Sequence, residues 1–85
     1  MSITIFGQDF KGTVLDKETK QPIFYSQVYF VDLKTGTTTD DNGIFKIEHF
    51  NQKYIHIQIS FVGYKIIDEI VNIDTVKEKT FYLEQ

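Results

Sequence analysis

Between Thr37 and Ile47 the chain reads TTTDDNGIFKI, and there it changes from a polar, oxygen-rich run to an apolar alternation. One interpretation is a loop that binds a cation. A calcium loop of the EF-hand kind has carboxylates at alternating positions and a closing Glu about 12 residues after the first ligand. Asp40 and Asp41 are adjacent instead, and Glu48 follows Asp40 too closely. The pattern therefore disfavours metal binding.

The other interpretation is a tight turn between two strands. Thr37 to Thr39 would form a short first strand, and the Asp40 carboxylate would accept backbone N–H groups across the turn. Asn42 and Gly43 suit the positive φ values of a hairpin reversal, and Phe45 is the first inward-facing residue of the next strand. We therefore predict a β-hairpin here and no metal site.

Apolar alternation recurs on both sides of this turn. The clearest strand is YIHIQISF, where Ile55, Ile57, Ile59 and Phe61 share one face, which we predict to be buried. The segment KIIDEIVNI carries Asp68 and Glu69 between apolar ends, which is typical of an edge strand that resists further pairing. The same period of two places a further set of side chains in the core: Val14, Val28, Phe30, Phe45, Ile47, Phe81 and Leu83.

The spacing of these runs indicates the fold class. Turn residues separate the runs about every 8–12 residues, which is typical of sandwiches and barrels. The chain is 15% aromatic and rich in β-branched residues, lacks Ala, and shows no convincing helix. We predict an all-β fold, an antiparallel β-sandwich of about seven strands.

Composition limits the classes of function. The 85 residues make a single domain, and without Cys neither a disulfide nor a thiolate metal site can stabilise it. The net charge is −3, and all 9 basic residues are Lys, scattered among acids. A chain without Arg or a basic run is not expected to bind nucleic acid. No apolar run approaches the ~20 residues of a membrane-spanning helix, so we predict no direct membrane span.

Residues 1–8, MSITIFGQ, are apolar and uncharged, and a hydrophilic run follows them. A complete secretory signal has a basic start and a longer apolar core. Two interpretations are open: a leader that adds an extra strand, or the remnant of a signal peptide.

Three motifs in order resemble those of the carboxypeptidase regulatory-like domain. They are GTVLDKETKQPI, TTTDDNGIFKI and IQISFVGYK, and the resemblance extends from about Phe10 to Leu83. The positions that carry it are Gly12, Val14, Asp16, Thr19, Pro22, Ile23, Thr39, Asp40, Gly43, Phe45, Ile59, Ser60, Gly63 and Tyr64. Phe24 and Tyr25 depart from the small residues that the family often has in that loop.

The resemblance implies a transthyretin-like (prealbumin-like) sandwich over residues 9–85 and an accessory role without catalytic residues. Such modules precede the plug and barrel of many TonB-dependent outer-membrane receptors, and they follow the catalytic domain of some metallocarboxypeptidases. The resemblance therefore implies an exported protein, placed on the periplasmic side of the outer membrane or at the cell surface. A protein partner or a neighbouring domain is the expected contact.

Candidate catalytic and ligand-binding side chains do not converge in the sequence. His49 and His56 would meet only across a hairpin and lack a third zinc ligand. Ser26 and Ser60 lack a nucleophile motif. Asp68 and Glu69 are adjacent and would point to opposite faces of a strand. We therefore predict no catalytic, cofactor-binding or metal-binding residues, no cofactor, and no enzyme activity.

Binding of a small ligand is the competing hypothesis. Exposed aromatic rings can stack on sugars, although a tyrosine on a strand is more often a packing partner across the strand pair. The candidates for an outer face are Tyr25, Tyr29, Tyr54 and Tyr82. A carbohydrate- or peptide-binding module is therefore the alternative to a protein-contact module.

Overall fold

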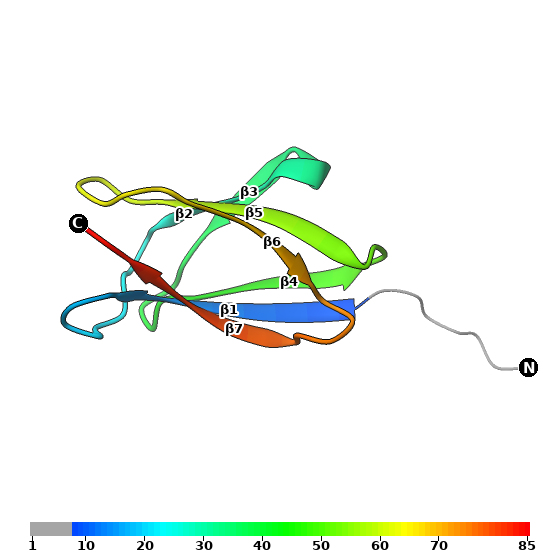
Figure 1. The fold of residues 1–85 in the computed structure, drawn as a ribbon, viewed down its shortest axis with the longest axis horizontal. Coiled ribbons are helices and arrows are strands. Elements are labelled where there is room, and N and C mark those ends of the chain that lie inside the picture. The colour runs from blue at the N-terminus through cyan, green and yellow to red at the C-terminus, as the bar shows by residue number, and fades with distance from the viewer. Residues whose placement is uncertain (1–7) are drawn as a thin grey trace, which may run out of the picture.

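The computed structural model describes residues 8–85, which form seven strands in two facing sheets (Figure 1). The strands are β1 (Gln8–Asp16), β2 (Gln27–Phe30), β3 (Thr35–Thr38), β4 (Ile44–Phe50), β5 (Tyr54–Ser60), β6 (Ile67–Asn72) and β7 (Glu78–Leu83). One 3₁₀ turn, η1 (Val31–Leu33), is the only helical segment in this part of the chain. The predicted β-sandwich of about seven strands is confirmed.

The two sheets have the orders β4-β1-β7 and β3-β2-β5-β6. All neighbouring strands pair antiparallel except β1 and β7, which are parallel. A parallel pair needs a long connection, and here the rest of the domain provides it, because β1 and β7 are the first and last strands. On one side of the sandwich Lys79 of β7 and Glu69 of β6 form an ion pair at 3.1 Å between the two sheets. The other edges, β3 and β4, therefore lie on the opposite side.

The core lies between the sheets and contains all the residues that alternation predicted except Phe61. It also contains five residues that were not predicted: Phe10, Ile23, Phe50, Val71 and Ile73. Its buried side chains include Val14, Val28, Phe30, Phe45, Ile47, Ile55, Ile57, Ile59, Phe81 and Leu83. Phe45 packs against the rings of Phe10, Phe30 and Phe81, with centroids 6.0–6.2 Å apart, and so joins both sheets. The ring also needs the space above Gly12, where an added Cβ would lie 2.1 Å from its Cζ atom.

The inward placement of Phe61 is wrong. Strand β5 ends at Ser60, and Phe61 is exposed in the loop that follows. The strand alternation continues into this residue in the sequence, but the chain leaves the sheet one position earlier. The prediction that the 65–73 segment forms an edge strand is confirmed, since β6 ends the four-stranded sheet.

The predicted hairpin across Asp40–Gly43 is also wrong. Strand β3 pairs with β2 in one sheet and β4 pairs with β1 in the other, so this turn crosses between the sheets. The turn chemistry itself is as expected: Asp40 Oδ1 accepts the N–H groups of Asn42 and Ile44, each at 2.9 Å. Gly43 has φ 74°, whereas Asn42 is not among the positive-φ residues. The same local turn can close a hairpin or join two sheets, so it does not identify the partner strand.

The leader or signal-peptide remnant predicted for residues 1–8 lies outside the described residues, apart from Gln8, which begins β1.

Candidate functional site

The motif residues gather at the end of the sandwich where β1 and β5 finish and the C-terminus lies (Figure 1). Asp16 closes the turn after β1, because its Oδ1 accepts the N–H groups of Glu18 at 2.8 Å and Thr19 at 2.9 Å. Its Oδ2 accepts a hydrogen bond from the Tyr64 hydroxyl at 2.6 Å. This contact joins the β1–β2 loop to the β5–β6 loop.

The Asp16–Tyr64 contact shifts the pKa of both groups. The hydroxyl of Tyr64 lowers the pKa of Asp16 below its usual range, and the N–H groups of Thr19 and Glu18 lower it further. The carboxylate of Asp16 raises the pKa of Tyr64 above its usual range, because the phenol must stay protonated to donate. Both shifts favour the carboxylate–phenol pair near neutral pH.

A buried hydrogen-bond network holds the β1–β2 loop from its other side. Thr39 Oγ1 donates to the carbonyl of Ile23 at 2.7 Å and accepts from the N–H of Ser26 at 2.9 Å. The hydroxyls of Thr39 and Ser26 also lie 3.0 Å apart, and both side chains are buried. Ser26 is therefore a structural residue with its hydrogen bonds satisfied.

Apolar side chains are exposed around this end of the sandwich. We call them the end cluster: Phe24, Tyr25, Phe61, Val62, Tyr64 and Ile66. Val62 is 92% exposed and Ile66 68% exposed, while Tyr64 is half-buried. The rings pair locally, with centroids 5.5 Å apart for Phe24 and Tyr25 and 5.8 Å for Phe61 and Tyr64. Exposed apolar patches on protein surfaces often mark contact surfaces.

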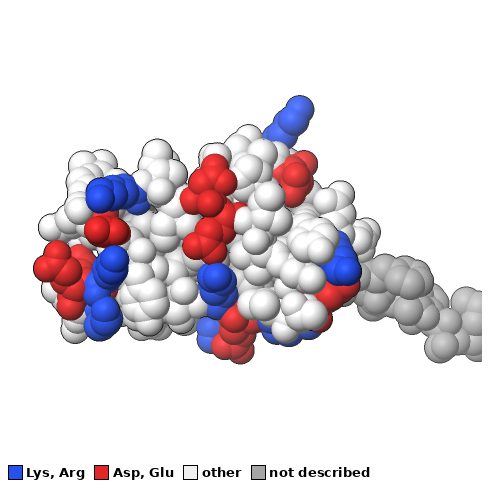
Figure 2. Space-filling model, in the orientation of Figure 1, with Lys and Arg blue, Asp and Glu red and all other residues white. Residues whose placement is uncertain are grey.

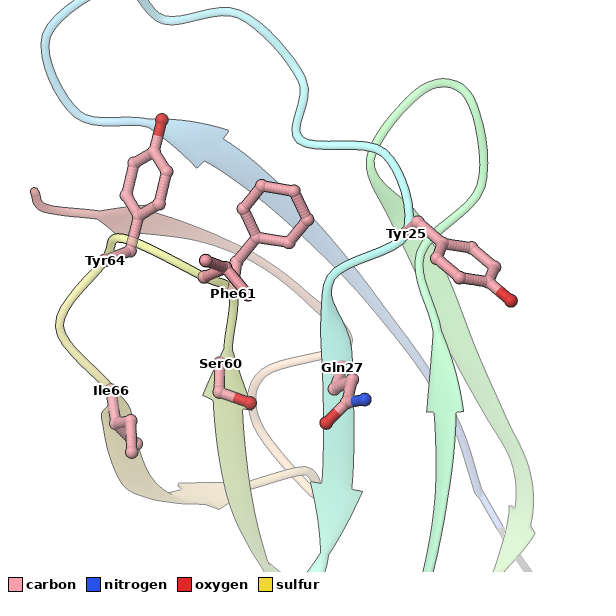
Figure 3. Close-up of a pocket in the computed structure, with 7 residues that line it drawn as sticks. Tyr25, Gln27, Ser60, Phe61, Tyr64 and Ile66 are labelled. Carbon is pink, nitrogen blue, oxygen red and sulfur yellow. The ribbon is translucent and has the colours of Figure 1, made fainter.

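All members of the end cluster except Phe24 line a groove of about 470 Å³, together with Gln27 and Ser60. Figure 3 shows Ile66 and Tyr25 on its two sides, with Ser60 and Gln27 between them and Phe61 and Tyr64 toward the end. Tyr25 holds its ring outward from a left-handed backbone with φ 69°. Such a conformation costs a non-glycine residue free energy, so the fold holds this exposed ring in a defined place.

A second polar cluster lies on the outer face of the four-stranded sheet. Asp68 Oδ1 lies 2.5 Å from His56 Nε2, and its Oδ2 accepts from Gln58 Nε2 at 2.7 Å. The bond from Gln58 and then that from His56 lower the pKa of Asp68. Asp32 covers the end of β2, where its Oδ2 accepts the backbone N–H of His56 at 3.2 Å. These side chains are already engaged with one another.

The candidate side chains from the sequence do not form a site. Strands β4 and β5 belong to different sheets, so no hairpin brings His49 and His56 together, and the side chain of His49 lies outside the described part. Asp68 bonds to His56 and Gln58, whereas Glu69 pairs with Lys79 across the sandwich. Among the described residues, no group of three or more His, Cys, Asp or Glu side chains is arranged to hold a metal ion.

The four predicted outer-face tyrosines, Tyr25, Tyr29, Tyr54 and Tyr82, are all exposed. They do not share one surface: Tyr29 and Tyr54 lie on strands of the four-stranded sheet, Tyr82 on a strand of the other sheet, and Tyr25 in a loop.

The surface charge is mixed. Figure 2 shows Lys side chains interspersed with Asp and Glu over the visible face, with no broad basic area. Within residues 8–85, no helix is long and apolar enough to cross a membrane.

Sequence reasoning identified Tyr25 of the end cluster as an exposed ring but missed the apolar surface that it shares with the other members. The signal of this surface is the run SFVGYKI, where Phe61 and Val62 place two apolar residues in succession and break the alternation of β5. Two apolar neighbours on a strand would point to opposite faces, so the run could have indicated an exposed apolar loop.

Comparison with known proteins agrees with the geometry of the fold. The family model described as CarboxypepD_reg-like domain matches residues 10–85, nearly the whole chain, and the chain belongs to this family. No curated protein matches the chain.

Proposed function

We propose that this CarboxypepD_reg-like domain is a non-catalytic accessory module that docks onto another domain or protein through its end cluster. The observation that carries the proposal is the exposure of Val62, Ile66 and Tyr25 around one groove. Burying such side chains contributes roughly 25 cal/mol per Å² of apolar area, and the free domain leaves this area in water.

The position of the groove also suits a contact between domains. The last residues of the chain lie beside it, since Lys65 N–H donates to the Glu84 carbonyl at 2.7 Å and Gln85 Nε2 donates to the Tyr64 hydroxyl at 3.2 Å. A domain joined after β7 would therefore start next to the end cluster. The module would then position that domain as well as contact it.

We place the module in an exported protein, at the N-terminal end of a TonB-dependent receptor and on the periplasmic side of the outer membrane or at the cell surface. Family resemblance supports this context. The full reading frame separates the alternatives: a plug and barrel downstream supports the receptor, whereas a peptidase domain upstream points to a metallocarboxypeptidase. Cell fractionation of the parent protein tests the location.

Site-specific crosslinking tests the docking surface. A photoreactive phenylalanine analogue at Val62 of the parent protein should form a crosslink to one defined protein or to another domain of the same chain. The matched control carries the analogue at Thr75, an exposed residue in the β6–β7 turn, and should give none. Equal crosslinking from both positions, or none from Val62, would reject docking through the end cluster.

Carbohydrate binding is the second candidate. The observation in its favour is that Tyr29 lies opposite Gln58, which in turn lies opposite Asp68, so a ring and polar groups share one row of the sheet. Titration with oligosaccharides, followed by the amide and tyrosine ring signals in NMR spectra, separates the two. A saturable shift along this row would favour the carbohydrate-binding module.

A further inference from the structure

Strand β3 is a sheet edge without the usual protection. It ends the four-stranded sheet, and its residues, Thr-Gly-Thr-Thr from Thr35 to Thr38, are all exposed. Edge strands usually carry charges, proline or a bulge that prevents another strand from pairing. β3 has no charged residue or proline, and its register with β2 is continuous.

The other three edge strands do carry charges. β6 has Asp68 and Glu69, β7 has Glu78 and Lys79, and β4 has Lys46 and Glu48. Of the four edges, β3 is therefore the one that offers its backbone N–H and C=O groups most openly. In an antiparallel sheet, alternate residues of an edge strand direct both groups away from the sheet.

A hollow of about 350 Å³ lies along this edge, lined by Gln27, Val28, Tyr29, Gly36, Thr37 and Thr38. Gly36 forms a floor without a side chain. A Cβ added there would lie 2.8 Å from the Val28 carbonyl oxygen and 3.7 Å from a ring carbon of Tyr29. The first distance is too short for a real Cβ, so only glycine fits at this position. The exposed ring of Tyr29 lines the hollow, and a side chain from another strand could fill the open space beside it.

Charges flank the two ends of β3. Lys34 directly precedes it, and Asp40 and Asp41 follow it closely, all with exposed side chains. A strand placed beside β3 would meet a positive charge at one end and negative charges at the other. This arrangement selects the direction of a charged peptide.

We propose that β3 binds an extended peptide segment of a partner protein as an additional antiparallel strand. The antiparallel direction follows from the sheet, in which every existing pair is antiparallel. The peptide would place an apolar side chain over Gly36 against Tyr29, a basic residue near Asp40 and Asp41, and an acidic residue near Lys34. Main-chain hydrogen bonds would supply affinity, and the Tyr29 hollow and the flanking charges would supply specificity.

This proposal goes beyond docking at the end cluster, because β3 belongs to a different surface. The two surfaces meet at Gln27, which lines both the groove and the hollow. Variants of Val62 and Ile66 should therefore leave peptide affinity at β3 unchanged, so that each proposal can fail alone.

The probe is a synthetic peptide with lysine at its N-terminal end, glutamate at its C-terminal end, and alternating valine and threonine between them. Added to the isotope-labelled domain, it should shift the amide signals of Thr35 to Thr38 and of their β2 partners in a saturable way. The control peptide exchanges the lysine and the glutamate, and it should bind more weakly because like charges then meet at both ends.

Backbone methylation tests the hydrogen bonds directly. We compare two peptides that carry N-methyl groups on alternate amides. In one peptide the methylated amides lie on the edge that faces β3, and in the other they lie on the opposite edge. One of them should bind at least about tenfold more weakly than the parent, since losing one or two hydrogen bonds costs this much, and the other should bind like the parent. Equal binding of the two methylated peptides would overturn strand addition.

Protein variants supply the matched comparison. Tyr29→Ser should weaken binding of the probe peptide, and Tyr54→Ser, which removes an exposed tyrosine from the same sheet, should not. Failure of the probe to shift the β3 signals would overturn the proposal. Shifts at Thr35 to Thr38 that depend on protein concentration without peptide would also overturn it, because the occupant would then be a second copy of the chain.

Discussion

Gly43 and Gly63 both have left-handed backbones, with φ 74° and 89°, but their surroundings differ. A Cβ at Gly43 would lie 2.5 Å from the Val14 carbonyl oxygen, whereas a Cβ at Gly63 would meet nothing within 4 Å. The Val14 carbonyl oxygen accepts the Ile23 N–H, so it cannot move freely. Gly43 therefore provides both a backbone conformation and space.

We expect Gly63→Ala to lower the free energy of unfolding by about 1–2 kcal/mol, the cost of a left-handed residue with a Cβ. Gly43→Ala should cost a further ~1–3 kcal/mol, because the close contact with backbone adds to that cost. Urea unfolding of both variants measures the difference. Equal losses would mean that the chain around Val14 and Pro22 can shift to admit a methyl group.

The hydrogen bond between Asp16 and Tyr64 should make stability depend on pH at both ends of the range. Asp16 has a lowered pKa, so its contribution is present near neutral pH and is lost as the pH falls below about 4. Tyr64 has a raised pKa, so its contribution is present below about pH 10 and is lost as the pH rises further.

We therefore expect Tyr64→Phe to lower the urea midpoint most between about pH 5 and pH 9, with the difference from the parent shrinking at both extremes. Other carboxylates titrate in both proteins, so they cancel in this comparison. Tyr54→Phe, which alters an exposed tyrosine, is the control. A difference that stays constant from pH 2 to pH 11 would contradict a charge-assisted bond.

Thr39 joins the end of β3 to the loop before β2. Its buried hydroxyl donates a hydrogen bond to the Ile23 carbonyl and accepts one from the Ser26 N–H. Thr39→Val keeps the shape but leaves the Ile23 carbonyl and the Ser26 N–H without this partner. We expect a loss of about 1–3 kcal/mol in the free energy of unfolding, as for other buried groups left unsatisfied. Thr39→Ser keeps the hydroxyl, so thermal unfolding should rank it between the parent and Thr39→Val.

The strands themselves were predictable because their two faces differ in polarity, as in β5, where Ile55, Ile57 and Ile59 are buried. The partner of each strand was not predictable in the same way. The turn at Asp40–Gly43 has the chemistry of a hairpin, yet β3 and β4 join different sheets. Pairing depends on residues far apart in the sequence, such as β1 with β7, and a local pattern carries no information about them.

The two candidate surfaces depend mostly on exposed residues, although Val28 of the core lines the hollow at β3 and Tyr64 packs against the core. In the sequence Phe61 continues the alternation of β5, and it is exposed beside Val62 because the strand ends at Ser60. The edge at β3 likewise follows from the order of strands in the sheet rather than from its Thr-Gly-Thr-Thr sequence. The family motifs indicated the fold, because most of them are structural: Asp16, Thr39 and Gly43 close turns and loops.

An 85-residue domain buries a limited apolar surface, yet Val62 and Ile66 are exposed and add little to its core. Their side chains therefore either contact a partner or have no effect on binding. If they serve contact, replacing both by Ser should change the free energy of unfolding by no more than about 0.5 kcal/mol, as for other surface positions. Ile59→Ala, a truncation in the buried row of β5, should by comparison cost about 2–5 kcal/mol. Urea unfolding compares the parent, the double variant and Ile59→Ala. Because Val62 is mutated in the double variant, its photoreactive residue is placed at Tyr25 instead. A stable double variant that loses the crosslink would assign these side chains to docking, whereas a large loss of stability would assign them to the fold and remove the basis for an end-cluster interface.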